Sequence, residues 1–344
     1  MFDMFPEQWT PVTFSRRVPR ERPIRGRVAG EDVVLFRDRA GRVAALIDRC
    51  PHRGVALSLG RVTPEGALEC PFHGWRFAAD GSCTRVPFCT DAKRERLGAI
   101  ALPVRERGGL VFLYTGVDAR GSEPELPEAL VEPGWSHFEH AEEWSTHWTR
   151  AMENMLDYPH LPYVHRRSIG RGLRAPAERG APLTLKVVPS PWGMEIVAHL
   201  DGRPAGAGLE WRRPNGMVLD LSFGRRRMRQ HVYCVPVDAR TTRMMLVTTR
   251  DFGLSWLLRP VFWAIDWSNT WILREDRAVV ESSQPPEVPP AADEKSVASD
   301  GPTLAFRRWY LKERERPMHA TVPPSALRRA RAASRQPAPL DEAS

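Results

Sequence analysis

The chain is poor in cysteine and has no long hydrophobic run. Five cysteines in 344 residues, an odd number, do not indicate a disulfide framework, so we expect reduced thiols in a cytoplasmic protein. The N-terminus lacks the apolar segment of a secretory signal. The longest apolar stretch, from Leu254 to Ile265, contains Arg259 and Pro260 and is too short to span a bilayer, which predicts no transmembrane segment. Its tryptophans favour a buried or pocket-lining helix over a helix on a membrane surface.

Two of the cysteines stand beside histidines in a repeated arrangement. Cys50 and His52 are followed by Cys70 and His73, and each pair lies in a segment with proline and glycine that is typical of a tight turn. Two thiolates on one iron and two imidazoles on the other are the ligands of a Rieske [2Fe–2S] cluster. A structural zinc site is the alternative, but such sites usually pair two cysteines in one loop and two histidines in another. We therefore predict that these four residues hold a [2Fe–2S] cluster.

The net charge of +8 comes from scattered arginines. No aromatic-interleaved basic patch or nucleic-acid motif accompanies them, so nucleic acid is not an expected partner. A solvated basic surface is the simplest interpretation. A docking surface for an acidic electron donor is the alternative.

Hydrophobic patterns predict an α+β protein in three parts. Short strands broken by turns are predicted from about residue 7 to residue 115, and residues 122–134, rich in proline and glutamate, indicate a linker. The next part contains strand-like runs at residues 217–223, 230–237 and 241–249 and a long helix at residues 260–283. The final segment is rich in alanine, arginine and proline, which is typical of disorder. The predicted boundaries are 1–121 and 122–317 for the two domains and 318–344 for a disordered tail.

A second group of metal-binding residue types follows the linker. His160 and His165 are separated by four residues and would diverge on an ideal helix, but Pro159 and Pro162 make an ideal helix unfavourable there. A distorted helix end can bring both imidazoles onto one ion, and Asp157 lies one turn before the first histidine. Two histidines and one carboxylate on Fe(II) leave positions open for O2 and a substrate. Two histidines without a metal near a helix end are the alternative.

The third ligand must be a carboxylate further along the chain. On a helix, Asp276 falls within an apolar stripe made by Ile272, Leu273, Val279 and Val280. An ionised side chain there is costly unless a metal or a partner compensates it. Glu281 falls on the polar face, where a pair with Arg277 accounts for it. We therefore predict Asp276 as the ligand, with a buried salt bridge as its alternative role and Asp266 as the second candidate.

These motifs resemble those of the catalytic α subunits of Rieske non-haem iron oxygenases. Four residues match the family's N-x-x-D-x-x-H-x(4)-H iron motif: Asn154, Asp157, His160 and His165. Segments at residues 275–281 and 299–309 are similar to the subgroup that contains pheophorbide a oxygenase and vanillate O-demethylase. The chain does not resemble the respiratory Rieske proteins, which have an extra cysteine in each cluster loop. At the corresponding positions this chain has Val55 and Phe72.

The resemblance implies a fold, a reaction and partners. It implies an N-terminal all-β Rieske domain followed by a helix-grip (START-like) catalytic domain with an antiparallel sheet. A separate reductase or ferredoxin would supply electrons to the cluster, which passes them to Fe(II) held by His160, His165 and Asp276. O2 would then hydroxylate or demethylate an apolar or aromatic organic substrate. The alternative function is a Rieske electron-transfer protein whose second domain binds a ligand without chemistry.

The resemblance also implies an assembly. In the family, the matching aspartate bridges an iron-ligand histidine and a cluster-ligand histidine of the neighbouring subunit in a ring-shaped trimer. Carried over, Asp157 joins His160 to His73 of the next chain, so we expect a homotrimer in which each active site needs a neighbour. Besides the metal ligands, Asp157 and Asn154 are the residues expected to act in catalysis.

Overall fold

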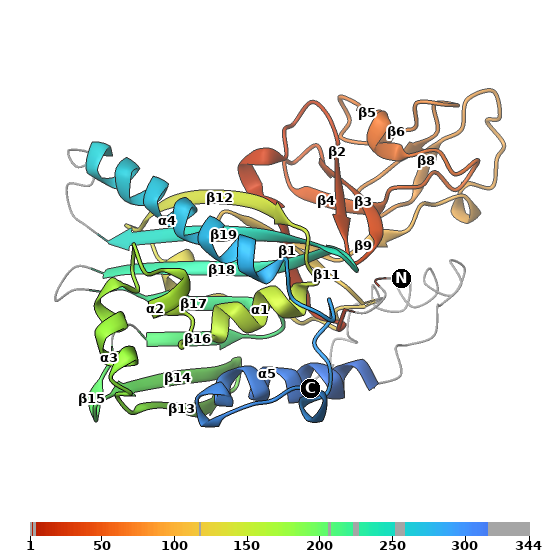
Figure 1. The fold of residues 1–344 in the computed structure, drawn as a ribbon. Coiled ribbons are helices and arrows are strands. Elements are labelled where there is room, and N and C mark those ends of the chain that lie inside the picture. The colour runs from red at the N-terminus through yellow and green to blue at the C-terminus, as the bar shows by residue number, and fades with distance from the viewer. Residues whose placement is uncertain are drawn as a thin grey trace, which may run out of the picture.

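The N-terminal part of the chain consists of short antiparallel strands (Figure 1). The computed structural model describes residues 2, 5–116, 118–205, 208–222, 227–251 and 259–315, so the predicted tail at residues 318–344 lies outside the described residues. The strands are β1 (Trp9–Phe14), β2 (Ile24–Val28), β3 (Glu31–Arg37), β4 (Val43–Ile47), β5 (Arg61–Val62), β6 (Leu68–Glu69), β7 (Arg76–Phe77), β8 (Cys83–Arg85), β9 (Ala101–Leu102), β10 (Val104–Arg107) and β11 (Leu110–Tyr114). They pair in the orders β1-β11-β10, β2-β3-β4-β9 and β5-β6-β7-β8. The prediction of an all-β N-terminal domain is thus confirmed.

The C-terminal part is one large antiparallel sheet with helices. Its strands are β12 (Ser136–Trp144), β13 (Leu183–Ser190), β14 (Gly193–Leu200), β15 (Arg203–Pro204), β16 (Gly208–Arg212), β17 (Gly216–Asp220), β18 (Arg227–Asp238) and β19 (Thr241–Asp251), paired in the order β12-β19-β18-β17-β16-β14-β13, with β15 beside β14. The helices are α1 (Trp148–Leu156), α2 (Leu161–Val164), α3 (Arg174–Glu178), α4 (Arg259–Val280) and α5 (Gly301–Glu315). Short 3-10 helices are η1 (Ser15–Arg17), η2 (Leu57–Leu59), η3 (Arg94–Arg96), η4 (Glu128–Leu130), η5 (Arg171–Leu173), η6 (Ala291–Asp293) and η7 (Ala298–Asp300). Figure 1 shows α1 and α4 crossing one face of the sheet. This arrangement confirms the predicted α+β fold.

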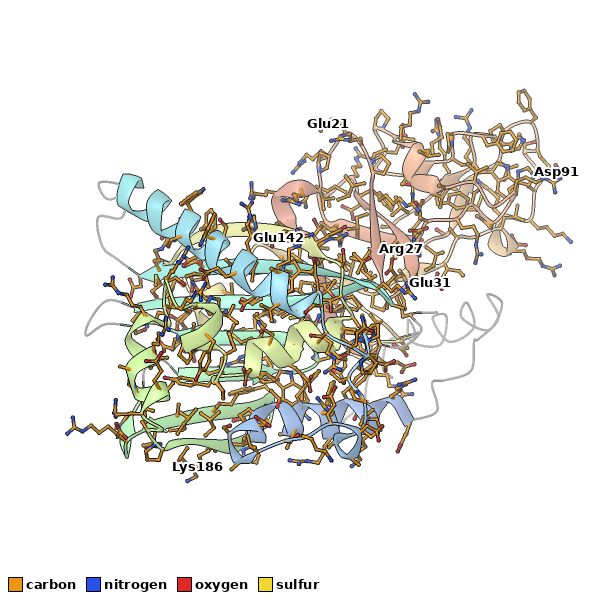
Figure 2. All side chains as sticks on the ribbon, in the orientation of Figure 1. Glu21, Arg27, Glu31, Asp91, Glu142 and Lys186 are labelled. Atoms are coloured by element: carbon orange, nitrogen blue, oxygen red, sulfur yellow. The ribbon has the colours of Figure 1, made fainter. Side chains whose placement is uncertain are left out.

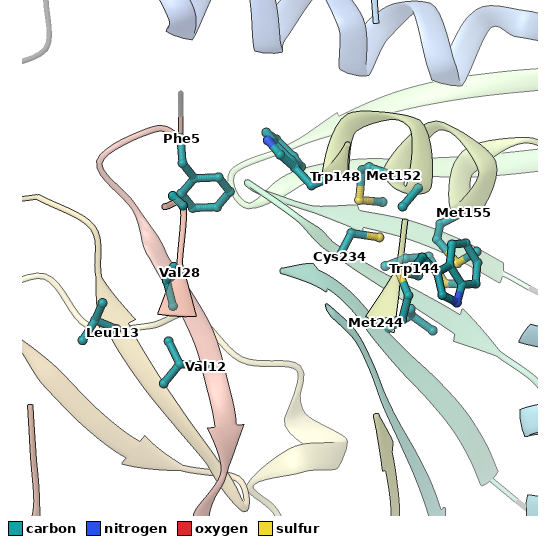
Figure 3. Close-up of a cluster of buried hydrophobic side chains, with 14 of the residues drawn as sticks. Phe5, Val12, Val28, Leu113, Trp144, Trp148, Met152, Met155, Cys234 and Met244 are labelled. Carbon is teal, nitrogen blue, oxygen red and sulfur yellow. The ribbon is translucent and has the colours of Figure 1, made fainter. Parts of the chain in front are cut away.

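The central hairpin β18–β19 is buried on both faces, because alternate residues of its strands point to opposite faces and pack in two different hydrophobic cores. Cys234 and Met244 point toward α1, where they pack with Trp144 and its neighbours (Figure 3). Residues of the opposite parity, Tyr233 and Met245 among them, pack against the N-terminal part. The sheet therefore connects the helices of one face to the small β-sheets of the other.

Backbone hydrogen bonds also join the two parts. The N–H groups of Ala29 and Gly30 donate to the carbonyls of Pro236 and Val237, at 2.9 Å in each case. The predicted linker is not wholly exposed, because it ends in η4, whose Leu130 is 2% exposed and belongs to the core under the sheet. Composition alone missed this packing, since proline and glutamate surround the few apolar residues, Leu126, Ala129 and Leu130, that pack inward.

Charged side chains lie mostly on the outside of the molecule. Glu21, Asp91 and Lys186 are exposed and lie at its periphery (Figure 2). Among the described residues, no helix has both the length and the hydrophobicity needed to cross a membrane.

Candidate cluster site and mononuclear metal site

The two cysteine–histidine loops have the same backbone design. In the loop after β4, the N–H of Gly54 donates to the carbonyl of Cys50 at 2.9 Å. In the loop after β6, the N–H of Gly74 donates to the carbonyl of Cys70 at 3.1 Å. Both glycines have positive φ angles, +74° and +66°, a conformation that other residues rarely adopt. Each turn therefore needs its glycine and presents one cysteine and one histidine.

The four side chains of these loops converge. Cys50 and Cys70 are 3% and 2% exposed, and the rings of His52 and His73 are 4.6 Å apart between centroids. The His52 ring also stacks on Trp75, 4.5 Å away and within 6° of parallel. Its Nδ1 atom is buried and has no hydrogen-bond partner in the part of the chain that the structure describes. An unpaired ring nitrogen beside a second imidazole is what a shared metal centre requires.

The cysteine sulfurs suit metal binding more than free thiol chemistry. Burial raises the pKa of the Cys50 thiol to about 11, although the backbone N–H groups of His52 and Arg53 favour the thiolate. Such a thiol is protonated near pH 7, so binding of a metal must displace its proton. The donor set and the backbone donors near the sulfur therefore fit a [2Fe–2S] cluster.

The second site forms where α1 ends and α2 begins. Asp157 caps the C-terminus of α1 in an extended conformation (φ −86°, ψ 132°), which breaks the helix as the nearby prolines predict. His160 precedes the first residue of α2, and His165 follows its last residue. The short helix therefore places the two histidines at its opposite ends but on the same side as α4.

The predicted carboxylate completes this group. His160, His165 and Asp276 each offer a ligand atom, and the three atoms lie within 4.8 Å of one another. Oδ1 of Asp276 is 3.0 Å from Nε2 of His165 and 3.5 Å from Nε2 of His160. Within the described residues this oxygen is buried and makes no aligned hydrogen bond. Three atoms that converge without hydrogen-bonding one another fit a shared ion, and two histidines with one carboxylate suit Fe(II).

Each histidine of the group has a second carboxylate behind it. Nδ1 of His160 lies 3.1 Å from Oδ2 of Asp157, and Nδ1 of His165 lies 2.9 Å from Oε2 of Glu275. Ser168 donates to the same glutamate oxygen at 2.7 Å. Burial raises the pKa of Glu275, but the hydrogen bonds from His165 and Ser168 outweigh burial and hold the pKa below its usual value. A carboxylate that accepts from Nδ1 fixes the ring tautomer and leaves Nε2 free to bind a metal.

Burial also acts on His165 itself. It lowers the pKa of His165, but the nearby carboxylate of Asp276 and the hydrogen-bonded carboxylate of Glu275 outweigh burial and raise the pKa above its ordinary value. The negative charge gathered around this imidazole is compensated when a cation binds between the ligands.

Sequence reasoning missed Glu275. The available signal was its position next to Asp276, about 100° around the helix, where its side chain can reach the far side of the same histidine.

The other candidates have structural partners. Asp266 forms a buried ion pair with Arg250 of β19, which explains its burial without a metal. Glu281 accepts from Arg277 at 2.8 Å, as predicted, and also from the backbone N–H of Ser145 at 2.6 Å. Nδ2 of Asn154 is buried and unpaired within the described residues.

The prediction of the apolar stripe is wrong for one residue, Val279. Leu273 and Val280 are each 5% exposed, whereas Val279 is 52% exposed. The buried face of α4 is therefore narrower than predicted. It includes Leu273, Asp276 and Val280, because only one side of the helix packs against the sheet.

Comparisons with known proteins identify both parts. Residues 8–100 match the Rieske [2Fe-2S] domain. Residues 144–316 match the vanillate O-demethylase oxygenase C-terminal domain. A Rieske protein with two metal sites is therefore the class that the fold and sites define, and the chain belongs to the vanillate O-demethylase oxygenase C-terminal domain family. The resemblance found in the sequence is confirmed.

Individual relatives agree with this assignment. Chlorophyllide a oxygenase of Chlamydomonas reinhardtii is 29% identical over 315 residues, which are 88% of this chain and 47% of the relative. The phenoxybenzoate dioxygenase subunit alpha of Ectopseudomonas oleovorans is 37% identical over 175 residues, which are 46% of this chain and 42% of the relative. The chain thus spans less than half the length of either relative. The solved structure of NdmA from Pseudomonas putida CBB5 shares the fold, with a TM-score of 0.76, 24% identity and 90% of each chain covered.

Proposed function

We propose that the chain is a Rieske-type oxygenase that oxidises an apolar or aromatic organic substrate with O2. The observation that carries this proposal is the convergence of His160, His165 and Asp276 in a chain that also has a Rieske domain. When bound, the cluster supplies one-electron transfer and the Fe(II) ion supplies activation of O2. A protein that only transferred electrons, or only bound a ligand, would not need this second ligand set.

The proposed roles of the residues follow from their positions. Cys50 and Cys70 hold one cluster iron, and His52 and His73 hold the other. At the second site, three side chains hold the mononuclear iron and leave its remaining positions open, because no fourth group of the described residues joins them. Asp157 and Glu275 hold the proton on Nδ1 of their histidines and so fix the orientation of both rings.

We propose further that the protein is a homotrimer that takes electrons from a separate reductase or ferredoxin. Within one chain, strands β5, β6 and β8 of the part that contains the cluster loops lie at the opposite end of the molecule from α2 (Figure 1). His73 is exposed, and the Asp157 side chain is 27% exposed, so His73 of a neighbouring copy has access to this carboxylate. The family resemblance supports this bridge. The trimer and the cytoplasmic location stay predictions.

The proposal is tested by metal content, spectroscopy and oxygen uptake. Purified protein reconstituted without air should contain about three irons per chain, two in the cluster and one at the second site. The reduced protein should give a Rieske-type EPR signal. With a surrogate reductase and a panel of aromatic methyl ethers and arenes, at least one compound should stimulate O2 uptake.

Cys50→Ala is the matched control, which should lose the cluster signal and keep the mononuclear iron. Stoichiometric zinc without a Rieske signal would contradict the proposal.

A further inference from the structure

Two buried polar atoms, one on α4 and one on β19, have no hydrogen-bond partner among the described residues. Thr248 is 0% exposed and Asn269 is 8% exposed. Oγ1 of Thr248 and Nδ2 of Asn269 make no hydrogen bond to any part of the chain that the structure describes. A buried polar group without a hydrogen bond destabilises a fold, so such groups generally have a partner that is not a protein side chain. Neither residue belongs to the metal sites.

The strand places Thr248 on the face that carries α4. Successive residues of a strand alternate between its faces, so Leu246, Thr248 and Arg250 share one face of β19. Leu246 packs in the same core as Leu273 of α4. Arg250 forms an ion pair with Asp266 of α4. Thr248 therefore lies on the face of β19 that carries the helices, two residues from the arginine that pairs with α4.

The helix places Asn269 at the matching position. Asn269 follows Asp266 by three residues and precedes Leu273 by four, which is the spacing of residues on one helix face. Asp266 forms the ion pair with Arg250 of β19, and Leu273 belongs to the same core as Leu246. Asn269 and Thr248 occupy the step between them, and both carry an unpaired polar atom.

The same helix face continues to the metal ligand. Asn269 lies seven residues before Asp276, which corresponds to roughly 10 Å along the axis and about 20° around it. A molecule with its reacting end at the ligands would need this length along α4 to reach Asn269 with its other end.

The charges around the two atoms decide which group they would bind. The nearest ionised side chains along these faces are Arg250 and Asp266, which neutralise each other. Asn269 offers an amide N–H donor, and Thr248 offers a hydroxyl. A buried carboxylate would need a net positive charge that this pair does not provide. A neutral oxygen acceptor needs only the two donors.

We propose that Asn269 and Thr248 form a polar subsite for a neutral carbonyl oxygen at the end of the substrate distant from the oxidised carbon. This inference rests on the proposed function, because the substrate is defined by the iron site. It narrows the substrate class to elongated apolar or aromatic molecules that carry an uncharged oxygen roughly 10 Å from the reacting position. Nδ2 of Asn269 donates one hydrogen bond to that oxygen, and the Thr248 hydroxyl donates the second.

Binding of matched probes to the iron-loaded full chain without air tests the subsite independently of turnover. The first pair is 4-methoxyacetophenone and 4-ethylanisole, and the second pair is 6-methoxy-2-acetonaphthone and 2-ethyl-6-methoxynaphthalene. Each pair differs in one carbonyl oxygen. We expect the ketone to bind roughly tenfold more tightly than its ethyl partner, which has the same methoxy group but no carbonyl, in at least one pair, the effect of one or two neutral hydrogen bonds.

The variants separate a subsite from a structural role. Asn269→Leu and Thr248→Val should each reduce the ketone preference to less than threefold. Neither should lower the melting temperature, because neither side chain loses a protein partner. Thr270→Val is the matched control. Thr270 is equally buried on α4, but its hydroxyl donates to the carbonyl of Trp267, so this variant should keep the preference.

Three results would overturn the subsite. The first is equal binding of the ketone and its ethyl partner in both pairs, including no binding of either. That result would leave water as the only partner of the Thr248 hydroxyl and the Asn269 amide. The second is a preference that survives in both variants. The third is tighter binding of 4-methoxybenzoate than of the ketone, which would assign a charged group. A chain that shows the ketone preference but never consumes O2 would refute the oxygenase proposal and leave the subsite as a ligand site.

Discussion

Glu275 and His165 form a hydrogen bond of 2.9 Å between Oε2 and Nδ1. Asp276, the next residue on α4, lies 3.0 Å from Nε2 of the same ring. Two consecutive carboxylates therefore contact both nitrogens of one histidine, one from the outside and one from the metal side. Because Glu275 and Asp276 are about 100° apart on the helix, a single helix sets both the orientation of His165 and the position of the third ligand.

Glu275→Gln should weaken the mononuclear site without changing the cluster. Glutamine keeps the size of the side chain and removes the charge that holds the proton on Nδ1. Loss of such an outer carboxylate typically costs 10-fold to 100-fold in metal affinity or activity, and we expect a loss of about this size in iron affinity. Competition with a chelator measures the affinity, and visible absorption monitors the cluster. Glu281→Gln on the same helix is the control. Equal iron affinities in the two variants would refute the role of Glu275.

Asp276→Ala should remove the mononuclear iron and abolish turnover while the cluster spectrum stays intact, because the two sites share no ligand. Glu281→Ala should keep its iron. The surface ion pair of Glu281 with Arg277 contributes about 0.3–0.5 kcal/mol to stability. Ser145 is exposed, so water can replace Glu281 as the acceptor for its backbone N–H. Iron content and O2 uptake of the two variants are the measurements. An active Asp276→Ala, or an inactive Glu281→Ala that retains its fold, would show that the helix-face argument chose the wrong carboxylate.

The sequence was sufficient for the metal-ligand candidates and insufficient for their surroundings. Helical periodicity favoured Asp276 over Glu281, because Asp276 falls within the apolar stripe of the helix. It left Asp266 as the second candidate, whose ion pair with Arg250 is known only from the structure. The same reasoning could not identify Glu275, since its partner is 110 residues away on a short helix whose orientation depends on the break at Asp157.

The sequence also could not predict which side chains of the sheet face the helices. The run at residues 241–249 predicts β19, but which alternate residues face the helices depends on its register with β12 and β18. Thr248 and Thr249 are both fully buried, and only the structure shows that the second hydrogen-bonds to His231, while the first remains unpaired within the described residues. Packing against α4 therefore separates two threonines that look alike in the sequence.

His147 should make stability depend on pH. Burial lowers the pKa of this histidine, the N-cap of α1, from 6.5 to about 4. As the pH falls from 6.5 to 4, the unfolded chain takes up a proton that the folded chain does not, so folding loses about 3 kcal/mol. His147→Asn keeps a capping acceptor and cannot titrate. Urea unfolding at pH 7 and pH 4.5 should show a smaller loss in this variant, by about 2 kcal/mol, than in the parent. His199→Asn in β14 is the control, and an equal loss in all three proteins would contradict the assignment.

Asp157→Asn should separate metal binding from turnover. Oδ2 of Asp157 accepts from the backbone N–H of His160 at 3.0 Å and contacts its Nδ1 at 3.1 Å. Asparagine keeps the size and one acceptor oxygen but loses the charge, so both metal sites should stay largely filled and the cluster should still accept electrons. Turnover should fall strongly, because the proposed bridge to His73 of a neighbouring copy needs a carboxylate between two imidazoles. Iron content, EPR and O2 uptake, with sedimentation for the oligomeric state, are the measurements. Near-normal turnover, or a fully active monomer, would refute the bridge, and selective loss of the mononuclear iron would indicate that Asp157 binds the iron directly.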